Sequence, residues 1–295
     1  MLVQVTRPRR SCLSVPGSSE RMLVKARSLP ADEIVIDLED AVAPAEKDEA
    51  REATVAALSK GGWQAHSIAV RVNGTETQWF ERDVRELAER AGDALGSIVV
   101  PKVESARDLE PLEQMLGSSS GGQRPLGVQA LIETAAGLAR VNEIAASMPR
   151  LETLIIGYAD LAASLGRPPS ARHDPDRWVF ALDAVLVAAR ASGIQAIDGP
   201  HLQIDDLDGL GTAAKRAREL GYDGKWALHP SQVGPINEVF TPTGEELARA
   251  WAILDVLESA EGGAGAGAAL LDGEMVDEAS RKLALNVLAR APEPR

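Results

Sequence analysis

Short apolar runs alternate with longer amphipathic stretches along most of the chain. The runs are rich in Val, Ile and Leu without strict polar alternation, as expected for strands covered on both faces. Eight runs predict strands: Cys12–Val15, Glu33–Leu38, Ser67–Val72, Ser97–Pro101, Val128–Glu133, Thr153–Gly157, Gln195–Asp198 and Trp226–His229. Amphipathic stretches predict helices: Glu46–Ser59, Phe80–Ala91, Ala135–Ser147, Arg177–Ser192, Leu207–Leu220 and Thr243–Leu257.

A regular succession of strand and helix predicts a parallel sheet. We expect this sheet to close into a (β/α)8 TIM barrel, with an open doubly wound sheet as the alternative. The predicted domains are a catalytic barrel over residues 1–258 and a C-terminal part over residues 259–295. That C-terminal part contains a glycine tether at 262–267, followed by a small appendix. Two alternatives are open for the appendix: it packs on this barrel, or it packs on the barrel of a neighbouring subunit.

Charged residues stand at or just after the downstream ends of the predicted strands. They are Asp37, Glu39, Arg71, Lys102, Glu133, Asp160, Asp198 and His229. In a barrel of parallel strands these ends meet at one rim, and that rim carries the active site in barrels of this kind. The pattern therefore predicts a fold and the place of a site together.

Glu133 and Asp160 are the strongest candidates for a metal site. They end adjacent predicted strands, and neither run contains a basic residue that would pair with them. Two carboxylates, together with waters and a substrate oxygen, form a site suited to Mg²⁺. The alternative is that each carboxylate caps the helix that follows it.

Arg71 is the candidate for binding an anionic substrate. It stands between Val70 and Val72, which points it to the rim or the interior of the barrel. There it could clamp a carboxylate or stabilise a developing oxyanion, but a structural ion pair with Asp37 or Glu39 is an equal alternative.

Two turns are weaker candidates. Residues 16–19 precede a helix that carries Arg21 and Lys25, so this turn could bind an anion or be an ordinary helix start. The turn at His229 and Pro230 could touch a ligand, although a lone histidine is more often structural.

Composition excludes several classes of function. The 295 residues carry a formal net charge of −13, whereas nucleic-acid binding needs a basic face. Cys12 is the single cysteine, so neither an internal disulfide nor a cysteine-based zinc cluster is possible. No apolar run approaches the roughly 20 residues of a membrane span. We therefore expect a cytoplasmic protein with no nucleic-acid or membrane partner.

Taken together, these residues resemble the citrate lyase beta-subunit and malyl-CoA lyase family of magnesium-dependent C–C lyases. The resemblance extends in order over nearly the whole chain. The matching stretches are Arg10–Ser18, Ile36–Pro44, Arg71–Gly74, Pro101–Val103, Leu131–Thr134, Gly157–Leu161, Ile197–Pro200, Gly224–Pro230, Phe240–Pro242 and Asp272–Asp277.

The resemblance implies roles for individual residues and a homotrimer or hexamer. Glu133 and Asp160 would bind Mg²⁺, and Arg71 would hold the oxo-acid end of the substrate. An aspartate at the position of Asp277 acts as acid/base in such enzymes and is presented by a neighbouring subunit. Four further residues match positions that lie along the substrate or CoA path in such enzymes: Ser14, Lys25, His229 and Pro230.

The implied activity is Mg²⁺-dependent retro-aldol cleavage, or the reverse condensation, of a malyl-, citramalyl- or citryl-CoA type thioester. The products would be a 2-oxo acid and acetyl-CoA. One alternative is a metal-dependent aldolase that acts on free hydroxy-oxo acids without CoA. The other is a non-catalytic subunit that binds a thioester or an acyl carrier protein.

Two departures from the malyl-CoA lyases favour the citrate-lyase-like side of the family. Ser19 stands where some malyl-CoA lyases carry an arginine, and the segment Gly166–Arg177 is shorter than theirs.

Overall fold

The computed structural model describes residues 7–91, 94–118, 125–168, 175–261 and 268–291. The predicted tether at 262–267 lies outside the described residues. Residues 169–174, within the segment Gly166–Arg177, also lie outside them. Within the described part of the chain, no helix combines the length and apolar character that a membrane crossing requires.

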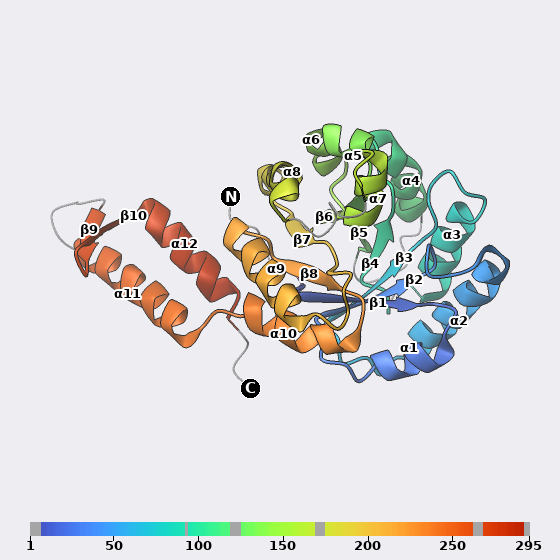
Figure 1. Ribbon diagram of the computed structural model, residues 1–295, viewed down its shortest axis with the longest axis horizontal. Helices are drawn as coiled ribbons and strands as arrows, with labels where there is room; N and C mark the ends of the chain where they lie inside the picture. Colours follow the sequence, from blue (N-terminus) through green and yellow to red (C-terminus); the bar gives the residue numbers. More distant parts are fainter. Residues whose placement is uncertain (1–6, 92–93, 119–124, 169–174, 262–267, 292–295) are drawn as a thin grey trace.

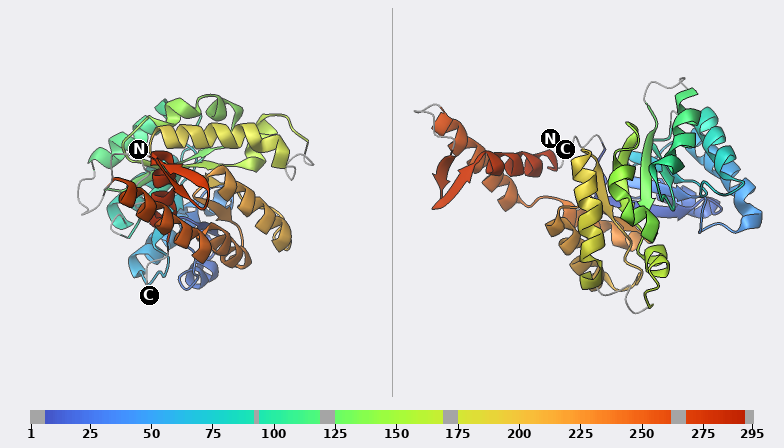
Figure 2. Two further views of the ribbon diagram at one scale, coloured as in Figure 1. Left: turned by 90° about the vertical axis from the view of Figure 1, so that its left-hand side faces the viewer. Right: turned by 90° about the horizontal axis from the view of Figure 1, so that it is seen from above.

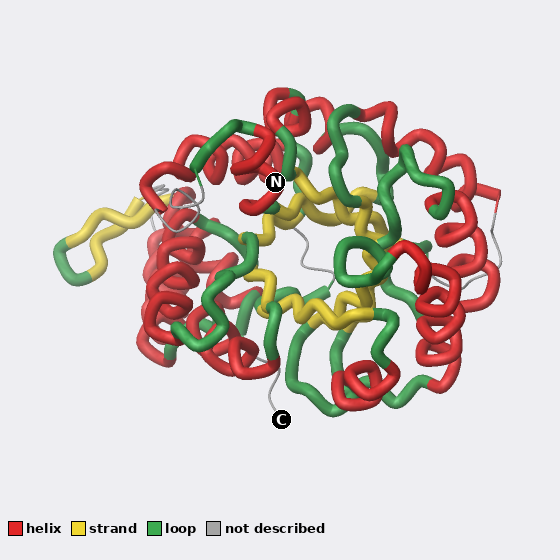
Figure 3. Tube along the Cα trace, turned by 45° about the vertical axis from the view of Figure 1, so that its right-hand side comes forward, coloured by secondary structure: helices red, strands yellow, loops and turns green. Residues whose placement is uncertain are grey.

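Eight parallel strands close into a barrel, because each strand pairs with the next and β8 pairs with β1. Figure 3 shows the ring of strands with the helices outside it. The strands are β1 (Ser11–Pro16), β2 (Glu33–Asp37), β3 (Ser67–Arg71), β4 (Ser97–Val100), β5 (Gly127–Ile132), β6 (Leu151–Ile156), β7 (Gln195–Asp198) and β8 (Gly224–Ala227). The predicted TIM barrel is confirmed, and the open sheet is excluded.

Helices cover the outside of the barrel (Figure 1). They are α1 (Glu20–Ala26), α2 (Lys47–Lys60), α3 (Phe80–Ala91), α4 (Glu110–Ser118), α5 (Ala135–Ala139), α6 (Val141–Ala145), α7 (Tyr158–Ser164), α8 (Val179–Ala191), α9 (Leu207–Leu220) and α10 (Pro230–Phe240). Short 3₁₀ turns are η1 (Pro44–Glu46), η2 (Ala106–Leu109) and η4 (Pro175–Trp178).

Two of the predicted helices show what sequence patterns capture. The predicted helix Leu207–Leu220 is α9, which Asp206 caps at its start and left-handed Gly221 (φ 110°) ends. The predicted helix Ala135–Ser147 is instead two helices, α5 and α6. Arg140 between them has φ −113° and ψ 18°, outside the helical region, so the helix is interrupted there.

The barrel lumen is filled by layers of inward-facing side chains. The middle layer takes one apolar residue from each strand: Cys12, Val35, Ala69, Val99, Leu131, Ile155, Ile197 and Trp226. Because side chains alternate between the two faces of a strand, residues two positions away in either direction also face the lumen. The strands thus place polar residues both below and above an apolar layer.

The two polar layers differ in composition. The layer toward the strand N-termini includes Glu33 and Gln129, both fully buried. The layer toward the strand C-termini includes Asp37, Arg71 and Glu133, three of the predicted rim residues. The fold therefore brings together side chains that lie far apart in the sequence.

The chain after α10 forms a separate projection from the barrel, which begins before the predicted boundary at residue 259 because α11 (Gly244–Glu261) belongs to it (Figures 1 and 2). It consists of α11, the hairpin β9 (Ala268–Leu271) and β10 (Glu274–Asp277), and α12 (Glu278–Ala289). At the end of α12, Arg290 donates a hydrogen bond of 2.8 Å to Asp223, which directly precedes β8. The projection therefore leaves the barrel at the N-terminal ends of its strands, away from the predicted rim.

Candidate active site

Arg71 and Asp37 form the centre of the charged cluster at the rim. They are register partners on β3 and β2. Arg71 donates to both carboxylate oxygens of Asp37, from Nε at 2.8 Å and from Nη2 at 2.5 Å. Its Nη1 lies 3.1 Å from Oε2 of Glu39. The structural ion pair that the sequence left open is therefore present, and it fixes the guanidinium at the rim.

The surroundings of Arg71 keep it charged. Burial opposes its charge, but the hydrogen bonds to Asp37, together with the charges of Asp37, Glu39 and Glu133, outweigh burial and raise the pKa of Arg71. The guanidinium carbon also lies 6.0 Å from the ring centre of Trp226, within range of a cation–π contact. A permanently charged arginine at the top of the lumen is suited to bind a carboxylate.

Glu133 is a buried carboxylate whose negative charge is only partly balanced by neighbouring groups. It directly follows β5 and is only 2% exposed. Its Oε1 accepts the backbone N–H of Lys102 at 2.9 Å. Burial raises the pKa of Glu133 to about 8, and the charges of Asp160 and Glu39 add to this rise, while Arg71 and the Lys102 N–H oppose it. A group in this condition would be stabilised by a cation.

Asp160 approaches Glu133 from the neighbouring strand–helix unit. β6 is hydrogen-bonded to β5, and Asp160 lies in the first turn of α7, which follows β6. The alternative that Asp160 caps this helix is wrong, because Gly157 is the N-cap. Likewise Thr134, and not Glu133, caps α5 by accepting the N–H of Gly137. Neither carboxylate is therefore accounted for as a helix cap.

Gly157 makes room for the Glu133 carboxylate. A Cβ at position 157 would lie 2.6 Å from Oε2 of Glu133, closer than any side chain tolerates. Since Oε1 is held by Lys102, Oε2 is the oxygen left for a further ligand.

These residues fit a Mg²⁺ ion with few protein ligands. Among the described residues no group of three or more His, Cys, Asp or Glu side chains could hold a metal. Mg²⁺ does not need such a group, because it keeps several waters and is commonly bound through one or two carboxylates plus substrate oxygens. Glu133 and Asp160 match that donor set, and burial, with the charges of Asp160 and Glu39, raises the pKa of Glu133 despite the opposing charge of Arg71.

Glu39 and Lys102 complete the cluster. The Lys102 ammonium pairs with Oε1 of Glu39 and lies 3.6 Å from Oδ2 of Asp40. Burial raises the pKa of Glu39, although Arg71 and Lys102 oppose this rise. Glu39 thus links the arginine to the lysine.

Not all of the remaining residues predicted to contact the substrate lie at the rim beside Arg71 and Glu133. Ser14 faces the lumen two residues after Cys12 and is half-buried. His229 caps α10 at the rim, where its Nδ1 lies 2.8 Å from the Ser231 hydroxyl, and Pro230 is the first residue of that helix. Lys25 is exposed in the last turn of α1.

Asp277 is far from the rim of its own barrel. It is the N-cap of α12, whose other end contacts Asp223 at the N-terminal ends of the strands. Its carboxylate accepts the N–H groups of Ala279 and Ser280, and these bonds, that from Ser280 first, lower the pKa of Asp277. Within one chain the structure does not bring Asp277 to Glu133.

Asp198 reaches the strand ends but faces outward. Its neighbour Ile197 faces the lumen, so Asp198 points to the helices, where it pairs with the buried Lys225 and accepts the Tyr158 hydroxyl. These residues border a cavity of about 350 Å³ between β7, α8 and α9. The expectation that every charged strand end gathers at one site is therefore wrong for Asp198.

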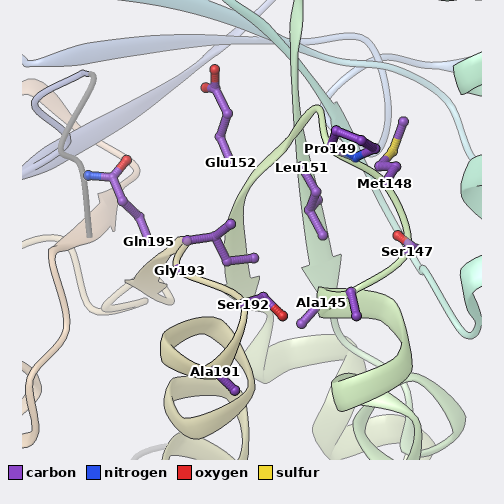
Figure 4. Close-up of a pocket in the computed structure, with 12 residues that line it drawn as sticks. Ala145, Ser147, Met148, Pro149, Leu151, Glu152, Ala191, Ser192, Gly193 and Gln195 are labelled. Carbon is purple, nitrogen blue, oxygen red and sulfur yellow. The ribbon is translucent and has the colours of Figure 1, made fainter. Parts of the chain in front are cut away.

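A second cavity, of about 720 Å³, lies at the opposite end of the barrel (Figure 4). It is lined by the loops before β6 and β7, with Glu152 and Gln195 among its residues. Both side chains already bind Arg9. This end of a TIM barrel serves stability, so we do not place the chemistry there.

Sequence reasoning missed two contributors to the site. Gly157 acts by its lack of a side chain, and Trp226 contacts Arg71 from the far side of the lumen. The period of two along β8 could have placed Trp226 in the lumen, but nothing in the sequence marks Gly157.

Comparisons with known proteins show the family to which the chain belongs. The family model described as HpcH/HpaI aldolase/citrate lyase matches residues 10–230. An L-malyl-CoA/beta-methylmalyl-CoA lyase of Cereibacter sphaeroides is 38% identical over 303 residues, covering 97% of this chain and 95% of the relative. A (3S)-malyl-CoA thioesterase of the same species is 39% identical over 286 residues, covering 96% and 95%.

Solved structures that are similar to this chain have names that agree with this family. The protein CitE of Mycobacterium tuberculosis, in complex with magnesium, acetoacetate and coenzyme A, superposes with a TM-score of 0.76 at 32% identity, over 97% of this chain and 98% of that one. A citrate lyase beta subunit complexed with oxaloacetate and magnesium, from the same organism, gives a TM-score of 0.66 at 31% identity, over 80% and 98%.

Proposed function

Because the chain belongs to the HpcH/HpaI aldolase/citrate lyase family, we propose that it is a Mg²⁺-dependent C–C lyase acting on a 3-hydroxyacyl-CoA thioester. The observation that carries the proposal is the buried Glu133 carboxylate, which lies close to Asp160 and is only partly compensated by Arg71. The relatives named malyl-CoA/beta-methylmalyl-CoA lyases favour malyl-type thioesters as substrates.

The residues at the rim have different proposed roles in metal binding and substrate binding. Glu133 and Asp160 would hold the ion, which when bound supplies a Lewis acid and a template for substrate oxygens. Arg71, fixed by Asp37 and Glu39, would bind the carboxylate of the oxo-acid half and oppose the negative charge that develops there. Ser14, Lys25 and the His229–Pro230 turn would lie along the path of the CoA chain.

We further propose that Asp277 of a neighbouring subunit exchanges a proton with the α-carbon of the thioester. Asp277 stands at the start of α12, and the opposite end of this helix contacts Asp223 before β8, so its place away from its own rim supports delivery to another copy. Burial against a partner would also raise its pKa from the low value set by its helix-capping bonds and make it a better base. A homotrimer, or a hexamer, would satisfy this geometry.

A complementation experiment tests delivery from a neighbour. Glu133→Gln and Asp277→Ala subunits are each expected to be inactive alone. Refolded together in equal amounts, they should regain roughly a quarter of the wild-type sites, because a mixed oligomer combines an intact barrel with an intact appendix. A mixture that stays inactive, although the two chains assemble, would contradict delivery in trans.

The activity itself is tested by product analysis. Enzyme, Mg²⁺ and malyl-CoA should yield glyoxylate and acetyl-CoA, with free acid and no CoA giving no turnover. Turnover of free hydroxy-oxo acids would favour the CoA-independent aldolase, and binding of an acyl carrier protein without turnover of any thioester would favour the non-catalytic subunit.

Thioester hydrolysis is a second candidate, because one relative at 39% identity is named a (3S)-malyl-CoA thioesterase. The same incubation separates the two reactions. Hydrolysis releases malate and free CoA, whereas cleavage of the C–C bond releases a 2-oxo acid. We also propose a cytoplasmic location, in keeping with Cys12 as a single buried thiol.

A further inference from the structure

We infer that Lys102 is a positioning residue with two separable roles, one carried by its backbone and one by its side chain. The inference rests on the proposed function, because the two groups that Lys102 holds are the candidate metal ligand Glu133 and, through Glu39, the candidate substrate clamp Arg71. Because the two roles depend on different groups, substitutions at position 102 should affect Mg²⁺ binding and kinetics with the 2-oxo acid differently.

The backbone of Lys102 has an uncommon conformation. Its φ is +52°, in the left-handed region, and only one other described residue besides glycine, Asp272, has a positive φ. Glycine would adopt this conformation without steric cost, whereas a lysine meets a clash between Cβ and the backbone. A strained residue at a site rim is a reason to look for a function in both its backbone and its side chain.

The left-handed turn directs two successive N–H groups to the same neighbour. Lys102 N–H binds Oε1 of Glu133 at 2.9 Å, and Val103 N–H binds the carbonyl of Leu131 at 3.3 Å. In an extended strand, successive N–H groups point to opposite sides, so both bonds to the end of β5 require a break in the strand at this point. The backbone thus fixes one oxygen of Glu133 and leaves Oε2 for the ion.

The side chain of Lys102 acts on the other half of the site. Its ammonium pairs with Oε1 of Glu39, while Oε2 of Glu39 lies 3.1 Å from Nη1 of Arg71 as an ion pair. Glu39 is therefore held between two cations. Without Lys102, the described residues leave the Glu39 carboxylate with Arg71 as its ion-pair partner and the backbone N–H of Asp40 as a donor, and the orientation of the guanidinium would be less fixed.

Substitutions separate the two roles. Lys102→Gly and Lys102→Asn accept the left-handed conformation but remove the ammonium, whereas Lys102→Val disfavours the conformation and also removes the ammonium. Lys102→Arg keeps a cation for Glu39. Asp272→Val is a matched control, because it places the same β-branched residue at the other positive-φ position (φ 51°), in the β9–β10 turn.

The first readout is Mg²⁺ binding measured by titration calorimetry with Mg²⁺ alone. Lys102→Val should weaken Mg²⁺ binding about 10-fold or more, the usual effect of losing a group that orients a metal ligand. Lys102→Gly and Asp272→Val should bind Mg²⁺ as the wild type does. Wild-type affinity in Lys102→Val, or a loss in Lys102→Gly equal to that in Lys102→Val, would overturn the backbone role.

The second readout is the kinetics of condensation with the 2-oxo acid varied. Lys102→Gly should raise KM for the 2-oxo acid and lower kcat/KM about 10-fold or more, with Lys102→Arg recovering most of the loss. Unchanged kinetics in Lys102→Gly would overturn the side-chain role. If the wild type itself neither binds Mg²⁺ nor forms product, the proposed function fails, and that outcome is distinct from either of these.

Discussion

The two ends of the barrel lumen both contain a buried glutamate, but in opposite electrostatic surroundings. At the N-terminal end, Glu33 pairs with Arg9 at 3.0 Å and accepts the amide of Gln129 at 2.9 Å. At the C-terminal end, Glu133 accepts one backbone N–H and has the acidic Asp160 and Glu39 as neighbours. One end neutralises its carboxylate within the chain, and the other leaves a carboxylate that a cation would complete.

This difference separates stability from function. Arg9 is 1% exposed and also binds Glu152 at 2.7 Å and the side chain of Gln195, so the N-terminal network is closed. Buried charges persist in a fold only when they are paired or coordinate a metal. The incomplete pairing at the C-terminal rim therefore indicates where the ligand binds.

The largest expected effect comes from removing the rim carboxylates. Glu133→Gln or Asp160→Asn should lower kcat/KM for malyl-CoA cleavage about 10³-fold or more, because the several kcal/mol supplied by a metal Lewis acid is lost. Neither change should reduce the melting temperature of the metal-free protein below pH 8, since Glu133 is protonated there and Asp160→Asn removes a charge that opposes ionisation of Glu133. Full activity in both variants would mean that the rim is not a metal site.

The same experiment at the other end should give the reverse result. Arg9→Met leaves Glu33 buried without its cation and should cost about 3–5 kcal/mol of unfolding free energy in urea titrations. Because Arg9 lies below the apolar layer, the folded fraction should keep its kcat. A variant as stable as the wild type would show that the N-terminal network is not a stability element.

Changing the clamp should have an intermediate effect. Arg71→Lys keeps the charge but cannot form the paired hydrogen bonds to Asp37, so the position of the cation changes. We expect kcat/KM to fall about 10²-fold, the size seen when one oxyanion donor is removed, with Mg²⁺ affinity little altered. An equal loss of Mg²⁺ binding would place Arg71 in the metal site and not beside it.

A smaller effect concerns pH. The pKa of Glu133 is raised from 4.5 to about 8, so between these values the folded metal-free protein keeps a proton that the unfolded chain has lost. The stability due to this proton is full below pH 4.5 and is lost as pH rises toward 8. Mg²⁺ affinity has the opposite sign, because binding needs the carboxylate, and should rise up to about tenfold per pH unit.

Calorimetry in two buffers of different ionisation enthalpy checks this coupling. Near pH 7, binding of Mg²⁺ should release close to one proton. Binding that is independent of pH and releases no proton would contradict the uncompensated state of Glu133.

The barrel and the proximity of Glu133 and Asp160 could be predicted from sequence because each needs only local order along the chain. Apolar runs predict strands, and residues that end neighbouring strands, such as Glu133 and Asp160, must meet at one rim. The lumen layers were harder to predict. Both faces of each strand are apolar, so hydropathy does not show that Leu131 and Glu133 face inward while Ile132 faces the helices.

Other features depend on tertiary contacts that no pattern encodes. Asp160 is a helical residue because α7 begins at Tyr158, whereas the cap interpretation has the helix begin after Asp160. Asp198 turns away from the rim because Lys225 and Tyr158 engage it. The left-handed conformation of Lys102 has no sequence signal, since glycine is the residue that usually marks it.

A crystal structure grown with Mg²⁺ and glyoxylate tests the central claim most directly. We expect an ion about 2.1 Å from Oε2 of Glu133 and from a carboxylate oxygen of Asp160, with the oxo acid reaching toward Arg71. An ion bound elsewhere, or a vacant rim in which Glu133 and Asp160 point apart in the presence of both ligands, would contradict it.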